Sequence, residues 1–290
     1  MELWFAFYYC LNIMHRSMSP GQTAWLNIMV GNAHCVDEAR RIDLETLVCK
    51  IKDKSLVDVE QIDLDLKRNL GTSPEKISPV RTVLISWTVL NSGIGYSQGM
   101  DTICIVLYNH FCNSNSPQPE HDTLGALGFV LRVNAGYLPL HMHDKAPLNN
   151  AALFATEMWL EVGSTHPRLR GKILLALELF EIFALQHLSV CFANLFDKDA
   201  IHLVWEYLFR DQRGQWSRTE ILNLAARRCR HLVSASVLHY KKLWLYGKDE
   251  RQNFQIWENL LQMSDSDAVK SIIDIALFLE RVETLGGAAQ

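Results

Sequence analysis

The residues best suited to chemistry stand in two short polar motifs. The first contains Asp65 and Arg68, whose spacing places both side chains on one face of a short helix. The second contains Tyr96 and Gln98, which follow the glycine-punctuated turn at residues 91–95. Arginine stays charged and donates to two oxygens at once, whereas a carboxamide accepts and donates simultaneously. Together the motifs suit a site that directs one cation and one amide at a single target.

A single apolar helix is predicted to hold the two motifs apart. The apolar residues between the motifs recur at helical spacing: Val80, Val83, Leu84, Trp87 and Leu90. Ser73-Pro74 and Ser78-Pro79 introduce this segment, and Pro79 is predicted to occupy a first-turn position. A core helix of this kind would fix the separation of the groups at its two ends.

The rest of the chain also has helical periodicity. Apolar faces recur around residues 103–111, 173–184, 201–208 and 269–276, and Ser264 with Asp267 is predicted to cap the last of these helices. No series of alternating strands and no internal repeat of 20–50 residues is evident. The predicted fold class is therefore all-α, with many helices of moderate length around one extended core.

The predicted domain organisation is an apolar segment at residues 1–17 followed by one domain over residues 18–285, with internal loops near 112–120 and 138–149. The apolar segment has Glu2 where a signal peptide carries basic residues. Its run of about 14 apolar residues is shorter than the ~20 that span a bilayer. We expect it to pack against the domain or a partner, with membrane contact as the alternative, and we expect a soluble protein.

Composition narrows the class of partner. The 290 residues carry a formal net charge of -4, which argues against a nucleic-acid binder that neutralises phosphates. Seven scattered cysteines without a Cys-x-x-Cys pair indicate reduced thiols in a cytoplasmic protein. We therefore expect a protein partner and no nucleic acid.

Three other patterns have weaker interpretations. Gly93-x-Gly95-x-x-x-Gly99 lacks the preceding strand and the glycine spacing of a dinucleotide-binding turn. His141 and His143, with Asp144, lack the further ligands of a metal site, so no metal is expected. The basic cluster at residues 227–231 is predicted to be a solvated helix face, with contact to an acidic partner or a membrane head group as the alternative.

The two polar motifs also carry a family resemblance. Ile62-x-x-Asp65-x-x-Arg68, followed by Tyr96-x-Gln98-Gly99-Met100, resembles the TBC domain, a family of GTPase-activating proteins that act mainly on Rab GTPases. Two later segments, Phe192–Phe196 and Trp205–Phe209, are similar to the family's downstream pattern. The resemblance covers roughly Met18 to Glu280 and implies an all-α, multi-helix TBC-like fold.

The resemblance implies a mechanism in which two residues complete the active site of a GTP-bound Rab-type GTPase. Arg68 would neutralise charge on the phosphate, and Gln98 would position the attacking water. Four residues would support them: Asp65, Tyr96, Gly95 and Gly99. Mg²⁺ and GTP would arrive with the GTPase, so the protein would need no cofactor and would not hydrolyse GTP itself. A role in vesicle trafficking, with peripheral association with endomembranes, would follow.

Two departures from the family pattern keep a second hypothesis open. Gly21, Gln22 and Thr23 stand where the family usually has an arginine before Trp25, and Asn69 stands where a threonine usually follows Arg68. The alternative is a catalytically inactive scaffold that binds a GTPase or another membrane-trafficking partner. In that case Arg68 and Gln98 would be an ordinary surface ion-pair partner and a helix cap.

Overall fold

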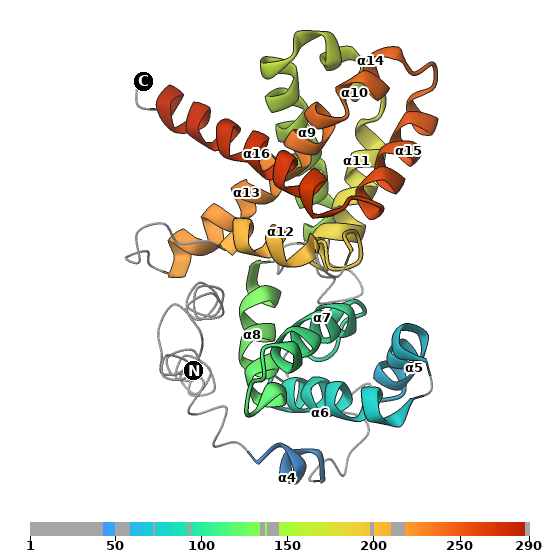
Figure 1. Cartoon of the computed structure of the whole chain (residues 1–290), viewed down its shortest axis with the longest axis vertical. Helices are drawn as coiled ribbons and strands as arrows, with labels where there is room; N and C mark the ends of the chain where they lie inside the picture. Colours follow the sequence, from blue (N-terminus) through green and yellow to red (C-terminus); the bar gives the residue numbers. More distant parts are fainter. Residues whose placement is uncertain are drawn as a thin grey trace. The chain divides into compact units, whose positions relative to one another are not determined.

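The computed structural model describes residues 43–49, 59–71, 73–91, 94–133, 137, 145–197, 200–209 and 218–287. Every regular element in these ranges is a helix (Figure 1), which confirms the all-α fold class. The chain divides into two compact units at Arg132 and Val133, and each is described by itself. The expected single domain over residues 18–285 stays a prediction. The segment 1–17 and the three residues His141, His143 and Asp144 lie outside the described ranges.

Unit 1 is built around the predicted core helix. Its helices are α4 (Leu44–Cys49), α5 (Val59–Leu70), α6 (Pro74–Leu90), α7 (Met100–Asn113) and α8 (Pro119–Val133). Helix α6 packs against α4, α5 and α7, and α5 also packs against α7. Val83 and Leu84 are fully buried, whereas Leu90, at the end of the helix, is only half-buried. The first polar motif thus lies on α5, which packs against α6, and the second lies in the loop that follows α6.

Unit 2 contains the remaining helices. They are α9 (Ala146–Thr165), the 3₁₀ turn η1 (Pro167–Leu169), α10 (Arg170–Leu175), α11 (Leu177–Phe183), the π turn η2 (Ala184–Leu188), α12 (Ala200–Phe209), α13 (Arg218–His239), α14 (Lys241–Tyr246), α15 (Glu250–Gln262) and α16 (Ser266–Gly287). Helix α13 packs between α9 and α16. Helix α9 begins at Ala146, so the last residues of the second predicted loop are helical.

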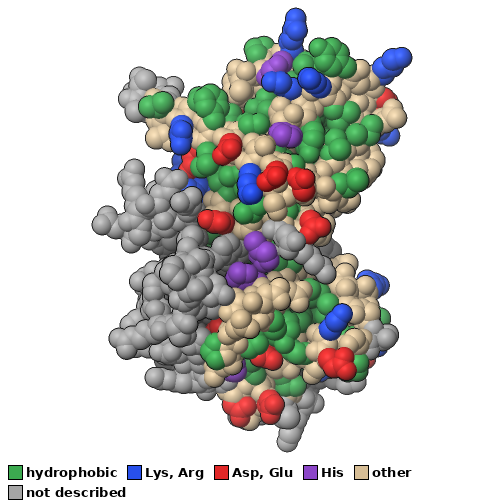
Figure 2. All heavy atoms as spheres, viewed as in Figure 1, with side chains coloured by type: hydrophobic (Ala, Val, Ile, Leu, Met, Phe, Trp, Pro, Cys, Tyr) green, Lys and Arg blue, Asp and Glu red, His purple; other side chains and the backbone are tan. Residues whose placement is uncertain are grey.

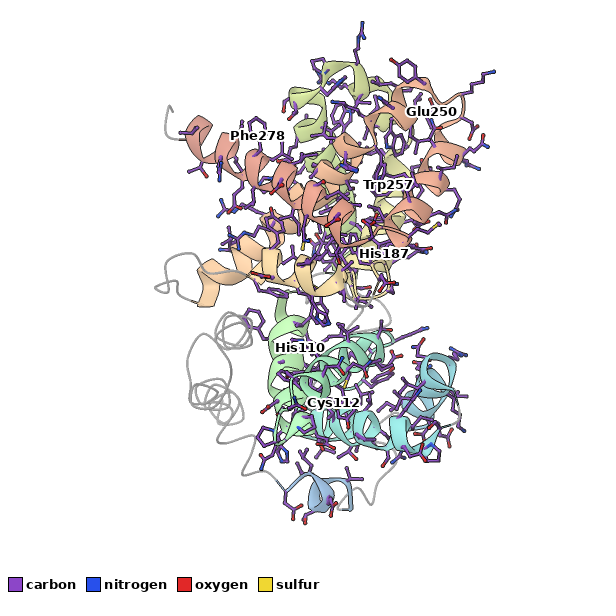
Figure 3. The ribbon with its side chains drawn as sticks, viewed as in Figure 1. His110, Cys112, His187, Glu250, Trp257 and Phe278 are labelled. Carbon is purple, nitrogen blue, oxygen red and sulfur yellow. The ribbon has the colours of Figure 1, made fainter. Side chains whose placement is uncertain are left out.

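An aromatic cluster forms much of the core of unit 2. Its rings, with neighbouring centroids 5.0–6.3 Å apart, belong to Phe180, Phe183, Trp244, Phe254 and Trp257. Trp257 and His187 are labelled in Figure 3, and both contact Phe183. Because aromatic side chains bury large areas, this cluster joins α11, α14 and α15 into one packed body.

Two helix starts differ from their predictions. Helix α6 begins at Pro74, so Pro79 lies inside the helix rather than in its first turn. Pro79 lacks an amide hydrogen, but this costs one hydrogen bond near the helix end and leaves the buried face intact. Helix α16 is capped by Asp265, whose carboxylate accepts the Ala268 N–H at 2.9 Å, and not by Ser264. Ser264 instead donates to the Leu260 carbonyl.

The downstream pattern at residues 192–209 has a structural role in the fold. Cys191 and Phe192 both adopt left-handed backbone conformations, with φ of 52° and 63°, which residues other than glycine rarely adopt. The buried indole of Trp205 donates to the Cys191 carbonyl at 2.7 Å. That hydrogen bond holds the strained turn against α12, which explains why an aromatic donor follows the turn at this spacing.

The prediction that residues 227–231 form a solvated basic face is wrong. Arg228 is 2% exposed and His231 is 1% exposed, and of these five residues only Arg227 is exposed to solvent. Arg228, Arg230 and His231 face carboxylates of both packed neighbours: Glu157 and Glu161 of α9, and Glu280 and Glu283 of α16. Because two helices cover α13, its basic residues form an internal ionic network that joins all three.

This network predicts an acid-sensitive contribution to the stability of unit 2. Partial burial acts to raise the pKa of Glu283, but Arg230 and His231 outweigh it, so the pKa lies below its ordinary value. A carboxyl with a lowered pKa adds stability above its unfolded value, ~4.3, and loses it as the pH falls through the folded value. Thermal unfolding at a series of pH values should show wild type and Glu283→Gln converging below about pH 4. A separation that persists unchanged to pH 2.5 would contradict this assignment.

Candidate functional site

The last turn of α5 places the first polar motif at the boundary between core and solvent. Ile62 and Leu66 are fully buried, and Asp65, which shares their face, is 3% exposed. Arg68 follows one turn later, and its side chain is 64% exposed. Its cationic group in the last turn is also favourable to the helix dipole. The helix therefore buries the carboxylate of the motif and presents its guanidinium to solvent.

Asp65 is satisfied by several donors despite its burial. Its carboxylate accepts from Nε2 of Gln61, 3.0 Å from each oxygen, and from Nη1 of Arg68 at 3.2 Å. The hydroxyl of Tyr96 donates to Oδ2 at 3.0 Å, from a position 31 residues away in the sequence. A buried carboxylate requires such partners. Asp65 is therefore a fixed point that contacts both polar motifs.

The loop that carries Tyr96 and Gln98 depends on two glycines. Gly95 and Gly99 have φ of 72° and 98°, in the left-handed region that favours glycine. A Cβ added at Gly95 would meet nothing within 4 Å, so the backbone conformation, and not crowding, accounts for glycine there. Gln98 is exposed and immediately precedes Gly99, the N-cap residue of α7. The loop thus presents a carboxamide at the start of a helix.

Tyr96 joins the two motifs through its hydroxyl group. The hydroxyl lies 3.0 Å from Oδ2 of Asp65 and 3.1 Å from Oδ1 of Asp101. Burial, followed by the negative charges of Asp101 and Asp65, raises the pKa of Tyr96 far above its ordinary value. The phenol therefore stays protonated at neutral pH and remains a donor. Its role is to tie the loop to α5.

Asp101 and Asn69 are part of the same arrangement, and sequence reasoning did not place them there. Asp101 is 2% exposed, and its Oδ1 also accepts the backbone N–H of Gly99 at 3.1 Å. Its Oδ2 accepts from Nδ2 of Asn69. An acidic residue in the first turn of a helix has an ordinary explanation in the helix dipole. The local sequence therefore does not indicate the tertiary contact of Asp101, and Asn69 stood out only because the family usually has a threonine at its position.

The structure thus brings all six predicted site residues into one region of unit 1. Two of them, Arg68 and Gln98, expose a cation and an amide. Asp65 and Tyr96 form the polar connection beneath them, and the two glycines shape the loop. A site with an exposed guanidinium and an exposed carboxamide, both held from below, can donate to an anionic group and orient a small polar molecule beside it.

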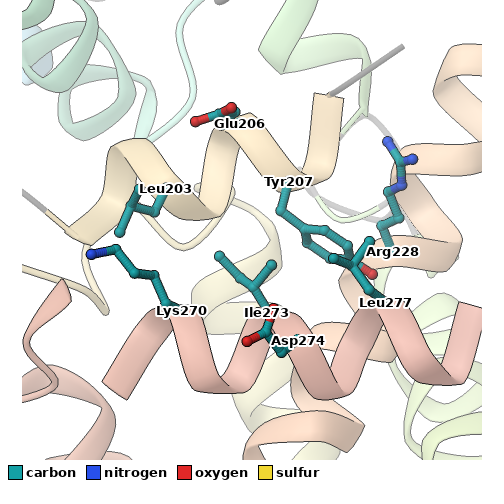
Figure 4. Close-up of a pocket in the computed structure, with 8 residues that line it drawn as sticks. All are labelled: Leu203, Glu206, Tyr207, Arg228, Lys270, Ile273, Asp274 and Leu277. Atoms are coloured by element: carbon teal, nitrogen blue, oxygen red, sulfur yellow. The ribbon is translucent and has the colours of Figure 1, made fainter. Parts of the chain in front are cut away.

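A separate pocket of about 230 Å³ lies in unit 2 (Figure 4). Tyr207 of α12 faces Ile273 and Leu277 of α16 across it, with charged side chains including Lys270 and Asp274 on the same helix. None of the six predicted site residues lines this pocket. The polar arrangement of unit 1 is therefore an exposed surface feature and not part of this pocket.

The outer surface adds two observations. On the face shown in Figure 2, several basic side chains lie near the top, and most of the acidic ones lie in the middle and lower parts of the view. Within the described residues, no helix has the length and apolar character needed to cross a membrane.

Comparisons with known proteins identify the fold and the family of this chain. The chain superposes on the crystal structure of the Ypt/Rab-GAP domain of Gyp1p with a TM-score of 0.68 over 97% of this chain and 99% of that chain. The two sequences are 12% identical, so this similarity concerns the fold, which is that of a helical Rab-GAP domain. Residues 39–226 match the model of the Rab-GTPase-TBC domain family. The chain belongs to this family. None of the curated proteins matches it in sequence.

Proposed function

We propose that this protein is a GTPase-activating protein that accelerates GTP hydrolysis by a Rab-type GTPase through Arg68 and Gln98. One observation carries the proposal: the exposed Arg68 and the loop of the exposed Gln98 are both attached to the buried carboxylate of Asp65. A surface used only for solubility does not require two exposed polar groups with a common buried support. Membership of the Rab-GTPase-TBC domain family supports the same conclusion.

Arg68 has the properties that phosphoryl transfer requires. Negative charge develops on the oxygens of the transferred phosphoryl group, and an arginine supplied in trans neutralises it. Asp65 contacts one guanidinium nitrogen, Nη1, at 3.2 Å, while the side chain remains 64% exposed. The contact restricts the orientation of the planar fork and leaves most of the group open to a partner. Asp65 therefore acts on the reaction by positioning Arg68.

Gln98 would position the attacking water. A carboxamide can accept a hydrogen bond from water and donate one to a phosphate oxygen. The backbone around Gln98 is fixed by the left-handed conformation at Gly99 and by the Tyr96 hydroxyl two residues earlier. Gly95 and Gly99 have no side chain, which would let a partner approach the backbone of the loop at these two positions.

The GTPase would bring the remaining components of the reaction. Mg²⁺ and GTP would be bound by the partner in its GTP-bound state, and this protein would supply side chains in trans. It would act in the cytoplasm and at the surface of endomembranes, where Rab-type substrates reside. The protein is therefore an activator of hydrolysis and not a GTP-binding hydrolase.

Single-turnover GTP hydrolysis by a panel of GTP-loaded Rab GTPases tests the proposal. At saturating concentrations, the protein should raise the rate of at least one Rab by several orders of magnitude over its intrinsic rate. Binding to a Rab without any acceleration would instead support the inactive scaffold, and the proposed catalytic roles of Arg68 and Gln98 would then be wrong.

Replacing Gln98 by alanine should lower the maximum stimulated rate by about 10²-fold, comparable to the loss of one preorganised polar group at a reacting centre. The concentration for half-maximal stimulation should change far less, because a small exposed side chain adds little to the total interface. Ser97→Ala, one residue earlier, is the matched control. A Gln98→Ala variant with the wild-type maximum rate would assign water positioning to the GTPase itself.

A further inference from the structure

The contact between Asn69 and Asp101 gives a role to a residue that departs from the family pattern. Asn69 directly follows Arg68 on α5, and Asp101 lies in the first turn of α7, three residues after Gln98. Nδ2 of Asn69 donates to Oδ2 of Asp101, across 32 residues of sequence. The two side chains therefore connect the helix that carries the guanidinium to the helix that follows the carboxamide.

Asp101 divides its two oxygens between the motifs. Oδ1 accepts from the Gly99 backbone N–H at 3.1 Å and lies 3.1 Å from the Tyr96 hydroxyl, whose single proton it shares with Asp65; both donors belong to the loop. Oδ2 accepts from Asn69 and so faces α5. With its side chain 2% exposed, Asp101 is removed from competing water. Charge-assisted hydrogen bonds in such surroundings are stronger than neutral ones.

We propose that Asn69 and Asp101 are positioning residues that set the placement of Gln98 relative to Arg68. The proposal rests on the proposed function, since it concerns the alignment of the same two groups. Alignment matters because a displacement of about 1 Å at a reacting centre can cost ~10²-fold in rate. Tyr96 and Asp65 form one link between the loop and α5, and Asn69 with Asp101 forms the second. Two links at separate points resist rotation of the loop, which a single link allows.

The polarity of the pair provides a sharp test. Asn69 is itself exposed, and its contact with the buried Asp101 is partly buried. Asn69 can donate to the carboxylate of Asp101, whereas an aspartate at position 69 could only accept, so Asn69→Asp would place a second carboxylate against that of Asp101. In Asn69→Asp/Asp101→Asn the polarity is reversed. The new amide nitrogen would donate to residue 69, and the new amide oxygen would still accept from Tyr96 and Gly99. The double variant should therefore rebuild the link.

Single-turnover hydrolysis by a Rab that the wild type stimulates measures the effect on the reaction. Asn69→Asp should lower the maximum stimulated rate by at least 10-fold and by up to ~10²-fold. The half-saturating concentration should change much less. The double variant should recover to within a few-fold of wild type. Asn69→Ala, which removes the donor without adding charge, should fall between them and covers the case in which Asn69→Asp does not fold.

A charge control separates the link from simple electrostatics. Glu60 is an exposed acid in the first turn of the same helix. Asn69→Asp/Glu60→Gln has the net charge of the wild type but does not rebuild the contact, so it should stay as slow as Asn69→Asp. Rescue by Glu60→Gln equal to that by Asp101→Asn would overturn the proposal, and so would a wild-type maximum rate in Asn69→Asp.

Amide hydrogen exchange in the isolated protein tests the link without any GTPase. Exchange over residues 95–101 should be faster in Asn69→Asp than in wild type and should return in the double variant, with an unchanged pattern in α15 as a check on global folding. Unchanged exchange over residues 95–101 in Asn69→Asp would overturn the proposal. If exchange follows the expected pattern but the wild type stimulates no Rab, the positioning pair stands and the proposed function fails.

Discussion

Replacement of Arg68 by alanine is expected to abolish stimulation of the GTPase, with a fall of ~10³–10⁵-fold in the single-turnover rate at saturating protein. The variant loses the charge that would neutralise the phosphoryl oxygens in the transition state. The effect should concern the maximum rate, because that interaction is strongest when charge has developed. Thermal unfolding should change little, since the Arg68 side chain is 64% exposed and the buried Asp65 keeps its contacts with Gln61 and Tyr96.

Two further variants give this result its meaning. Lys67→Ala removes the neighbouring exposed cation of the same helix and should leave most of the stimulation intact. Arg68→Lys keeps the charge but loses the planar fork, so its rate should stay far below that of wild type. If Arg68→Ala retained stimulation within a few-fold of wild type, Arg68 would be only the surface partner of Asp65, and another residue would act on the phosphate.

Among the proposed substitutions, Arg228→Ala should give the largest decrease in the free energy of unfolding, about 3–5 kcal/mol. Arg228 is 2% exposed, contacts both oxygens of Glu280 at 3.3 and 3.4 Å, and lies over the Tyr207 ring at 5.6 Å from its centroid. The substitution leaves the carboxylate without this partner and removes the packing of a long side chain. Calorimetry should show the unfolding midpoint of unit 2 lowered by roughly 10 °C.

The adjacent residue provides the control for this prediction. Arg227 has the same side chain on the same helix but is exposed, so Arg227→Ala should change the free energy of unfolding by no more than about 0.5 kcal/mol. Equal effects of the two substitutions would contradict the internal network and support the solvated face that the sequence predicts for residues 227–231. A second measurement, the stimulated rate at 20 °C, should be near wild type for both variants while they remain folded.

Local periodicity was sufficient to predict the fold class. The helical spacing of Val80, Val83, Leu84 and Trp87 identified α6, because one buried face repeats every three to four residues whatever packs against it. Helix starts were less predictable. Pro79 and Ser264 both looked like start signals, but Pro74 and Asp265 are the residues used. Several residues near a helix end can satisfy its free amides, and the competition between them is settled by tertiary packing.

The basic cluster of α13 shows a second kind of limit. A run of cations reads as a solvated surface because charge is rarely buried without partners. The partners of Arg228, Arg230 and His231 lie on α9 and α16, between 52 and 73 residues away. Neither the pairing nor the burial is visible in the local sequence, since each depends on which helices cover α13.

For the candidate site, the sequence by itself identified Arg68, Gln98 and Asp65 as candidate residues, and the structure shows that the first two are exposed and the third is buried. Their motifs are short, and a guanidinium, a carboxamide and a carboxylate each have a characteristic hydrogen-bonding chemistry. Only the tertiary structure placed Asp101 and Asn69 with them and showed that Tyr96 contacts both carboxylates. The physical reason is that a side-chain hydrogen bond depends on distances of about 3 Å between helices. Residue order fixes which groups a chain carries, and the packing of α5 against α7 fixes which of them meet.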